Sequence, residues 1–223
     1  MHQVDASQTN DTYARFWNRK QLAAEAPRFP VVRWWNTDGL SQIEAIYFDA
    51  IRNATSLLDI GAGDLRIQKK FRAAGYSGLY ETVDPGVEHR YTYTSLELVA
   101  RKYEAILCLD VIEHLPLTEG LDLLHRVTDL LAPGGVLVLQ TPNARCVRNP
   151  MSWDMTHLHC YNARDLWSYL SHLGYTVTGY RIEFRPGKLS LAASISSVIS
   201  KIVIVQLLGC DYADNLGFVA RLG

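Results

Sequence analysis

Leu57-Leu58-Asp59-Ile60-Gly61-Ala62-Gly63-Asp64 is the stretch that decides the fold of this 223-residue chain. Apolar residues run into an acid, and two glycines spaced by one residue follow. We interpret residues 56–60 as a buried strand, 61–63 as a tight turn and Leu65 as the start of a helix that Asp64 caps. A glycine turn between a strand and a helix lets a ligand lie against bare backbone, which suits a nucleotide-like cofactor. A turn without a ligand would use the same residues, so the rest of the chain must decide.

A second acid, Asp84, follows the next predicted strand at residues 79–83 and lies 21 residues after Gly63. In a βαβ unit this spacing places a carboxylate at the tip of the neighbouring strand, where it can bind the two hydroxyls of a ribose. The alternative is an aspartate that only forms the turn before Pro85-Gly86.

Helices and strands alternate along the rest of the chain. This alternation favours a parallel sheet with helices on both faces. Hydrophobic spacing and turn residues predict helices at 41–52, 65–75 and 119–131 and one from Asn162 to Gly174; they also predict strands at 105–109 and 136–140, with 91–94 as a weaker candidate.

Composition limits the protein's class. With 48% hydrophobic residues the chain can bury a core as one domain, and its net charge of −1 offers no basic face for nucleic acid. The N-terminus has no basic region followed by an apolar run, so we expect no signal peptide. We interpret the cysteines, which show no C-x-x-C spacing, as reduced thiols of a cytoplasmic protein. They are Cys108, Cys146, Cys160 and Cys210.

Two segments could be additions to a main domain at residues 39–223. Residues 1–38 are rich in aromatic side chains, and Tyr13, Phe16 and Trp17 share one helical face. This segment could pack on the core or form a lid over a pocket.

The second segment is an apolar insertion at about residues 187–210. Lys201 and several serines within 189–208 argue against a membrane span. A helix packed between the last two strands, a homodimer face and a helix lying on a membrane surface all remain open.

Taken together, these motifs resemble the class I S-adenosylmethionine-dependent methyltransferases that act on small molecules. The resemblance covers roughly residues 40–180. It implies an α/β, Rossmann-like three-layer sandwich with a mostly parallel seven-stranded sheet whose last strand is antiparallel, the final pair lying at about 175–184 and 216–222. The matching pieces are residues 58–63, 83–84, 109–115 and 131–135, together with Thr141-Pro142-Asn143 and Asp154-Met155-Thr156-His157.

The resemblance also implies a binding site for S-adenosylmethionine. It places Asp59 and the glycine turn near the amino-acid moiety of the cofactor, Asp84 on the ribose, and the carbonyl of Leu109 on the amino group. The family's third motif glycine is replaced by Leu65, and its adenine-binding acid has no clear match at 90–98, where Glu97, Thr94, Ser95 or a backbone amide could serve. The expected cofactor-binding residues are Asp59, Gly61, Ala62, Gly63, Asp84, Pro85, Leu109 and Asp110.

Methyl transfer to a hydroxyl requires a base to remove the acceptor's proton. His114 follows the strand at 105–109, and His157 lies in the later matching piece, so both are candidate catalytic residues. The residues expected to contact the substrate or form a lid are Tyr13, Trp17, Asn143 and His159. We expect no metal: Asp110, His114, Asp154 and His157 could converge, but their spacing matches no metal signature.

The leading hypothesis is methyl transfer to a hydroxyl of a small biosynthetic molecule, such as a sugar or a natural-product intermediate. Motif residues recognise the cofactor and not the acceptor, so N- or C-methylation and a catalytically inactive binding scaffold stay open. A nicotinamide-dependent oxidoreductase would share the strand–glycine–helix start. It is disfavoured by Asp59 before the first glycine and by Pro133-Gly134-Gly135 before the strand at 136–140.

Overall fold

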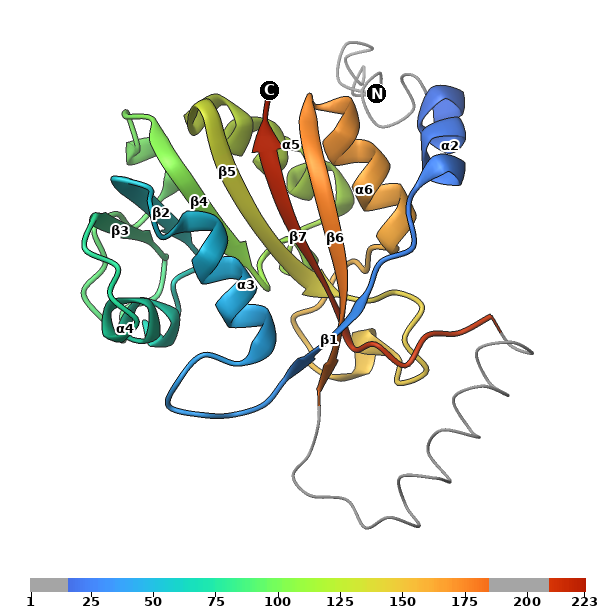
Figure 1. Cartoon of the computed structure of the whole chain (residues 1–223), viewed down its shortest axis with the longest axis horizontal. Coiled ribbons are helices and arrows are strands. Elements are labelled where there is room, and N and C mark those ends of the chain that lie inside the picture. Colours follow the sequence, from blue (N-terminus) through green and yellow to red (C-terminus); the bar gives the residue numbers. More distant parts are fainter. Residues whose placement is uncertain (1–15, 185–208) are drawn as a thin grey trace, which may run out of the picture.

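The computed structural model describes residues 16–184 and 209–223, so Tyr13 and nearly all of the apolar insertion lie outside the described residues. Its centre is a seven-stranded sheet with the order β1-β6-β7-β5-β4-β2-β3 (Figure 1). β7 runs antiparallel to both neighbours, and every other pairing is parallel. The expected mostly parallel sheet with an antiparallel last strand is therefore confirmed. The strands are β1 (Val31–Trp34), β2 (Ser56–Ile60), β3 (Leu79–Val83), β4 (Tyr103–Leu109), β5 (Leu131–Pro142), β6 (Tyr175–Phe184) and β7 (Asn215–Leu222).

Helices cover both faces of the sheet and make the expected three layers (Figure 1). Because side chains alternate along a strand, each strand feeds both layers of the core: Leu57 packs with α3 and α4, whereas Leu58 packs with α5 and α6. None of the described helices is long and apolar enough to cross a membrane. The helices are α2 (Phe16–Glu25), α3 (Gln42–Ile51), α4 (Arg66–Ala73), α5 (Leu117–Leu130) and α6 (Ala163–His172).

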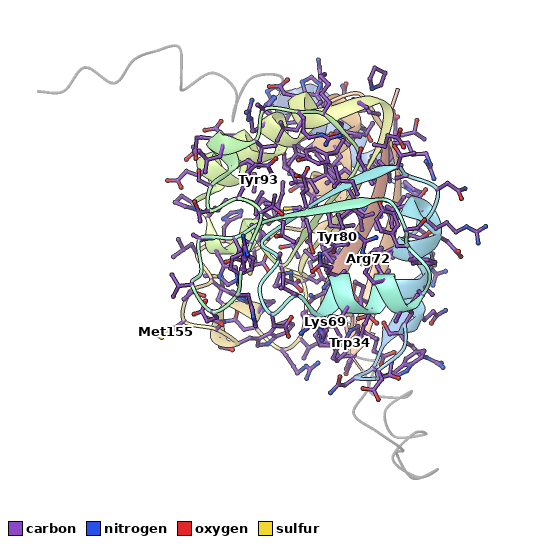
Figure 2. All side chains as sticks on the ribbon, turned by 90° about the vertical axis from the view of Figure 1, so that its left-hand side faces the viewer. Trp34, Lys69, Arg72, Tyr80, Tyr93 and Met155 are labelled. Carbon is purple, nitrogen blue, oxygen red and sulfur yellow. The ribbon has the colours of Figure 1, made fainter. Side chains whose placement is uncertain are left out.

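Local sequence signals account for most element boundaries. Asn162 precedes α6, and its side chain accepts a hydrogen bond from the backbone N–H of Asp165 (2.9 Å). At α4 the Asp64 side chain accepts from the N–H of Arg66 (2.9 Å), while Leu65 takes a left-handed conformation at φ +60°. The guanidinium of Arg72 in α4 then lies 5.7 Å from the ring centre of Tyr80 and joins the helix to β3 (Figure 2).

The candidate strand at 91–94 is not formed; a single bridge joins Tyr93 to Val83. Threonine side chains explain the interruption. The N–H of Thr82 donates to the hydroxyl of Thr92 (3.1 Å), and the N–H of Thr92 donates to the hydroxyl of Thr82 (3.0 Å). Side chains thus take the places that backbone carbonyls occupy in a strand ladder.

The seventh strand, β1, comes instead from the N-terminal segment. It pairs in parallel with β6, and Phe29 just before it packs edge-on against Phe218 with ring centres 6.1 Å apart. Earlier in the segment, α2 lies beside α6, with Lys20 Nζ 3.4 Å from Asp165 Oδ1. Part of the segment expected as a lid therefore completes the sheet.

Candidate functional site

The carboxyl ends of β2 and β4 and the N-terminus of α4 border a cavity of about 120 Å³, here called the central cavity. This edge is where ligands bind in open α/β sheets. Six residues expected to bind a cofactor line it together: Asp59, Gly61, Ala62, Gly63, Leu109 and Asp110.

The turn at 61–63 needs glycine for two reasons. Gly61 and Gly63 have φ values of +73° and +47°, which disfavour a residue with a Cβ. A Cβ on Gly61 would also lie 2.4 Å from Val111 Cγ2. The turn therefore presents bare backbone to the central cavity.

Asp84 is tied to this turn. Its Oδ2 accepts a hydrogen bond from the N–H of Gly63, and its Oδ1 accepts from the N–H of Gly86, each over 2.8 Å. Asp84 reaches the central cavity through Gly63 and does not line it, while Pro85 is exposed beyond it. The carboxylate thus stabilises the turn after β3 and is joined to the glycine turn, and its contact with a ribose stays a prediction.

Asp59 is buried at the end of β2, where the hydroxyl of Tyr80 donates a 2.6 Å hydrogen bond to its Oδ2. Burial raises the pKa of Asp59 from 3.8 to about 7, against the hydrogen bond from Tyr80, which lowers it; the charge of Asp84 raises it further. A positively charged ligand group beside Asp59 would favour its ionised form.

We expect Asp59→Asn to stabilise the ligand-free protein by up to about 4 kcal/mol at pH 8 and to have little effect near pH 4. The pKa of Asp59 is raised in the folded state, so this group favours folding below about pH 4 and loses that contribution as the pH rises through 7. Asparagine carries no charge and can still accept the bond from Tyr80. Urea unfolding at both pH values checks this; a stability change that is equal at pH 4 and pH 8 would contradict it.

Polar residues outside the sequence motifs surround Asp110 at the central cavity. Asp110 has a φ of +54°, and its carboxylate accepts hydrogen bonds from Gln140 Nε2 (2.8 Å) and Asn215 Nδ2 (2.9 Å). The hydroxyl of Tyr47 in turn donates to Gln140 Oε1 (3.1 Å). Tyr47, Gln140 and Asn215 come from three different elements, so no local spacing could have indicated them.

Arg66 and Trp34 also line the central cavity and escaped the sequence interpretation. The guanidinium of Arg66 lies 5.8 Å from the ring centre of Trp34. Arg66 brings a cation to a cavity whose other charged residues are Glu44, Asp59, Asp64 and Asp110.

The two candidate bases, His114 and His157, meet at the loop that follows β4. Their ring centres are 5.0 Å apart and both side chains are half-buried. Backbone hydrogen bonds hold the loop that contains His157 against Glu113, because the N–H groups of Leu158 and His159 both donate to the carbonyl of Glu113.

His159 and Trp17 lie elsewhere. His159 lines a separate cavity of about 280 Å³ next to α5 and α6, which Arg19 and Lys20 of α2 also border. Burial lowers the pKa of His159. Trp17 is 77% exposed, and neither residue lines the central cavity.

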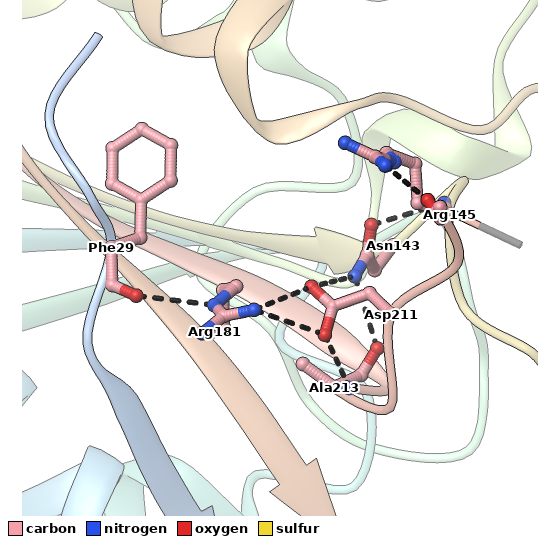
Figure 3. Close-up of polar contacts among 7 residues, drawn as sticks. Phe29, Asn143, Arg145, Arg181, Asp211 and Ala213 are labelled. Carbon is pink, nitrogen blue, oxygen red and sulfur yellow. Dashed lines mark hydrogen bonds and ion pairs between the residues drawn. The ribbon is translucent and has the colours of Figure 1, made fainter. Parts of the chain in front are cut away.

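Asn143 belongs to a network that holds the loop after β5 to the start of β7 (Figure 3). Its amide donates to Asp211 Oδ2 (3.1 Å) and to the carbonyl of Ala213 (3.0 Å), and Arg181 pairs with Asp211 from β6 (3.2 Å). Both amide hydrogens are used, so the side chain stabilises the loops. Asn143 borders a separate cavity of about 530 Å³ and not the central one.

Residues 90–98, where an adenine-binding group was sought, do not line the central cavity. Ser95 caps a short 3-10 helix, accepting from the N–H of Glu97 (3.3 Å). The adenine contact stays unassigned.

Comparison with known proteins adds the following. A family model described as a methyltransferase domain matches residues 11–179. A solved SAM-dependent methyltransferase from Archaeoglobus fulgidus is 14% identical, with a TM-score of 0.58 over 94% of this chain and 98% of that one. The magnesium protoporphyrin IX methyltransferase of Synechocystis PCC 6803, solved with bound SAH, is 13% identical, with a TM-score of 0.51 over 100% of this chain and 90% of that one.

The plantazolicin methyltransferase BpumL, solved with SAH and a desmethyl plantazolicin analogue, is 11% identical, with a TM-score of 0.54 over 97% and 88% of the two chains. At these identities the solved structures are evidence for the fold alone. No curated protein sequence matches the chain.

Proposed function

The chain belongs to the methyltransferase domain family and is a methyltransferase that uses S-adenosylmethionine; from this premise we propose that it methylates a hydroxyl group of a small molecule. The observation that carries the choice of a hydroxyl is the meeting of His114 and His157 near Asp110, which lines the central cavity. A hydroxyl must lose a proton to become a good nucleophile, whereas a neutral amine is already nucleophilic.

The residues around the central cavity match the cofactor in charge. A Cβ on Gly61 would collide with the side chain of Val111, so only glycine fits at this position of the turn. S-adenosylmethionine carries an ammonium, a sulfonium and a carboxylate. Asp59 and Asp110 match the positive groups, and Arg66 matches the carboxylate.

Each residue then has a role in binding. Asp59 and the carbonyl of Leu109 would accept hydrogen bonds from the ammonium, and Asp84 would accept them from the ribose hydroxyls. Tyr80 holds the carboxylate of Asp59 in place, and Gln140 and Asn215 hold that of Asp110, through the hydrogen bonds described above. Residues fixed in this way bind without a reorganisation cost.

S-adenosylmethionine supplies a methyl group bonded to a positively charged sulfur, a good leaving group for in-line displacement. The protein's task is to align the acceptor oxygen and remove its proton. The Nδ1 of His157 lies 2.8 Å from the carbonyl of Pro150, which can only accept, so Nδ1 carries the hydrogen. The Nε2 of His157 therefore has a free lone pair for the acceptor's proton.

We expect His157→Ala to lower turnover on hydroxyl acceptors by about 10²–10⁴-fold, the usual contribution of a general base, and to leave S-adenosylhomocysteine affinity within twofold. His159→Ala is the matched control, since it lies on the same loop but lines a different cavity. The assay transfers a radiolabelled methyl group to sugars, phenols and amines of similar size. Labelling of amines alone would overturn the proposal, and binding of the cofactor without labelling of any acceptor would favour an inactive scaffold.

We also propose that this reaction belongs to cytoplasmic biosynthesis. All four cysteines have free thiols, and Cys108 and Cys146 are buried, which supports a reducing compartment.

A further inference from the structure

Glu113, His114 and His157 each offer one metal-ligating atom, and these atoms all lie within 4.8 Å of one another. Glu113 and His114 are adjacent in the loop after β4, and His157 comes from the loop before α6. We propose that these three residues bind a divalent first-row transition-metal ion, such as Zn²⁺ or Co²⁺.

The carboxylate of Glu113 gives the first argument. Its side chain is fully buried, and its Oε2 accepts a hydrogen bond from the hydroxyl of Thr141 (3.0 Å). Its Oε1 is also buried and has no hydrogen-bond partner among the described residues. A buried carboxylate oxygen without a partner is costly, and coordination of a cation would satisfy it.

The two imidazoles give an independent argument. The Nδ1 of His157 donates to the carbonyl of Pro150 (2.8 Å). The Nδ1 of His114 faces the hydroxyl of Thr156 (2.8 Å) and its carbonyl (3.3 Å). Because a carbonyl only accepts, Nδ1 of His114 also carries its hydrogen. The Thr156 hydroxyl in turn donates a hydrogen bond to Asp154 Oδ1 (2.7 Å).

Both rings therefore keep a free lone pair on Nε2. A histidine whose Nδ1–H is held by a carbonyl or by a chain ending in a carboxylate has the arrangement typical of metal ligands, because the hydrogen bond sets the tautomer and the ring orientation. A ring nitrogen that binds a metal must present a lone pair, and a nitrogen that carries a hydrogen has none to present.

The donor set indicates the kind of metal. Two neutral imidazoles and one carboxylate suit Zn²⁺, Co²⁺ or Fe²⁺ better than Ca²⁺ or Mg²⁺, which prefer oxygen ligands. Three protein ligands leave coordination positions open, as in catalytic sites. The sequence spacing could not indicate this site, because Glu113 and His157 are 44 residues apart and only the fold brings them together.

A role for the ion rests on the proposed function and replaces the general-base role of His157, because the Nε2 lone pair of His157 would bind the metal instead of the acceptor's proton. His114 and His157 lie near enough to Asp110, which lines the central cavity, for their charges to act on it, and we place the acceptor hydroxyl at an open coordination position on that side. A hydroxyl oxygen bound there would lose its proton to solvent more readily. The oxygen would then form the new O–C bond as the C–S bond breaks and sulfur keeps the electron pair.

The test uses the full chain, freed of metal with a chelator and then titrated with Co²⁺, whose visible absorption reports the number and type of its ligands. We expect one equivalent of Co²⁺ to bind, with an absorption spectrum typical of nitrogen and oxygen ligands, and Zn²⁺ to displace it. His157→Ala and Glu113→Gln should each weaken binding at least 100-fold, and Thr156→Val by about 10–100-fold, the usual loss when a metal ligand loses its orienting partner. His159→Ala should bind as the parent does.

No saturable Co²⁺ or Zn²⁺ binding by the folded protein would overturn the proposal, and so would binding that His157→Ala leaves unchanged. Since His157 lies on a loop, this variant keeps the test valid if Glu113→Gln fails to fold. Full activity of the chelated enzyme on hydroxyl acceptors would overturn the catalytic role of the ion and leave the proposed function standing. Metal binding without methylation of any hydroxyl would overturn the proposed function and leave the metal site standing.

Discussion

Replacing Lys70 with methionine is expected to lower the free energy of unfolding by about 3–5 kcal/mol, because the Glu44 carboxylate would stay buried without its counter-ion. Lys70 Nζ lies 3.0 and 2.9 Å from the two carboxylate oxygens of Glu44, and the two side chains are only 6% and 3% exposed. Glu44 also accepts a hydrogen bond from the N–H of Ser41 (2.7 Å) at the start of α3. The pair therefore connects α3 to α4 next to the central cavity.

Lys69→Met is the matched control, since this neighbour on α4 is exposed (Figure 2). Its substitution should change stability by no more than about 0.5 kcal/mol. The double variant Glu44→Gln/Lys70→Met removes both charges and should recover much of the loss. Urea unfolding measures all three; equal stability of Lys70→Met and Lys69→Met would show that the ion pair contributes nothing.

Asp84→Ala should weaken S-adenosylhomocysteine binding by about 10²–10⁴-fold, because two charge-assisted hydrogen bonds to the ribose, worth about 1.5–3 kcal/mol each, would be lost. The variant would also leave the N–H of Gly63 without its acceptor at the glycine turn. Calorimetric titration of the folded variant gives the affinity directly and needs no acceptor.

Glu88→Ala serves as the control in the same loop, because Glu88 is exposed and its carboxylate accepts a hydrogen bond from the neighbouring N–H of Val87 (2.9 Å). We expect its affinity for S-adenosylhomocysteine to match that of the parent protein. If Asp84→Ala also binds like the parent, the ribose contact has been assigned to the wrong residue.

Local chemistry explains what could be predicted. The strand at 56–60 and the turn at 61–63 depend on apolar runs, glycine and short-range capping, all of which are visible in neighbouring residues. The same holds for the cap at Asn162. Family resemblance added the seven strands and the antiparallel direction of the last one, whereas the order of the strands came from the structure.

The predicted strand at 91–94 is not formed and the strand β1 was not predicted, and both errors have a common cause. Residues 91–94 have strand-forming side chains, but Thr82 and Thr92 bond each other's backbone and interrupt the ladder. β1 forms because β6 offers it a free edge, and the residues of β6 that pair with β1 lie 150 positions later in the chain. Strand propensity alone cannot tell these two cases apart.

The fold family, the glycine turn and the positions of Asp59 and Asp84 at strand ends could be predicted, because residues close to one another in the chain encode these features. Only the tertiary structure decided that Arg66 and Gln140 border the cavity and that Asn143 stabilises a loop. It also decided that His114 and His157 meet beside Glu113. Contacts between distant loops depend on how the whole core packs, so no local spacing records them.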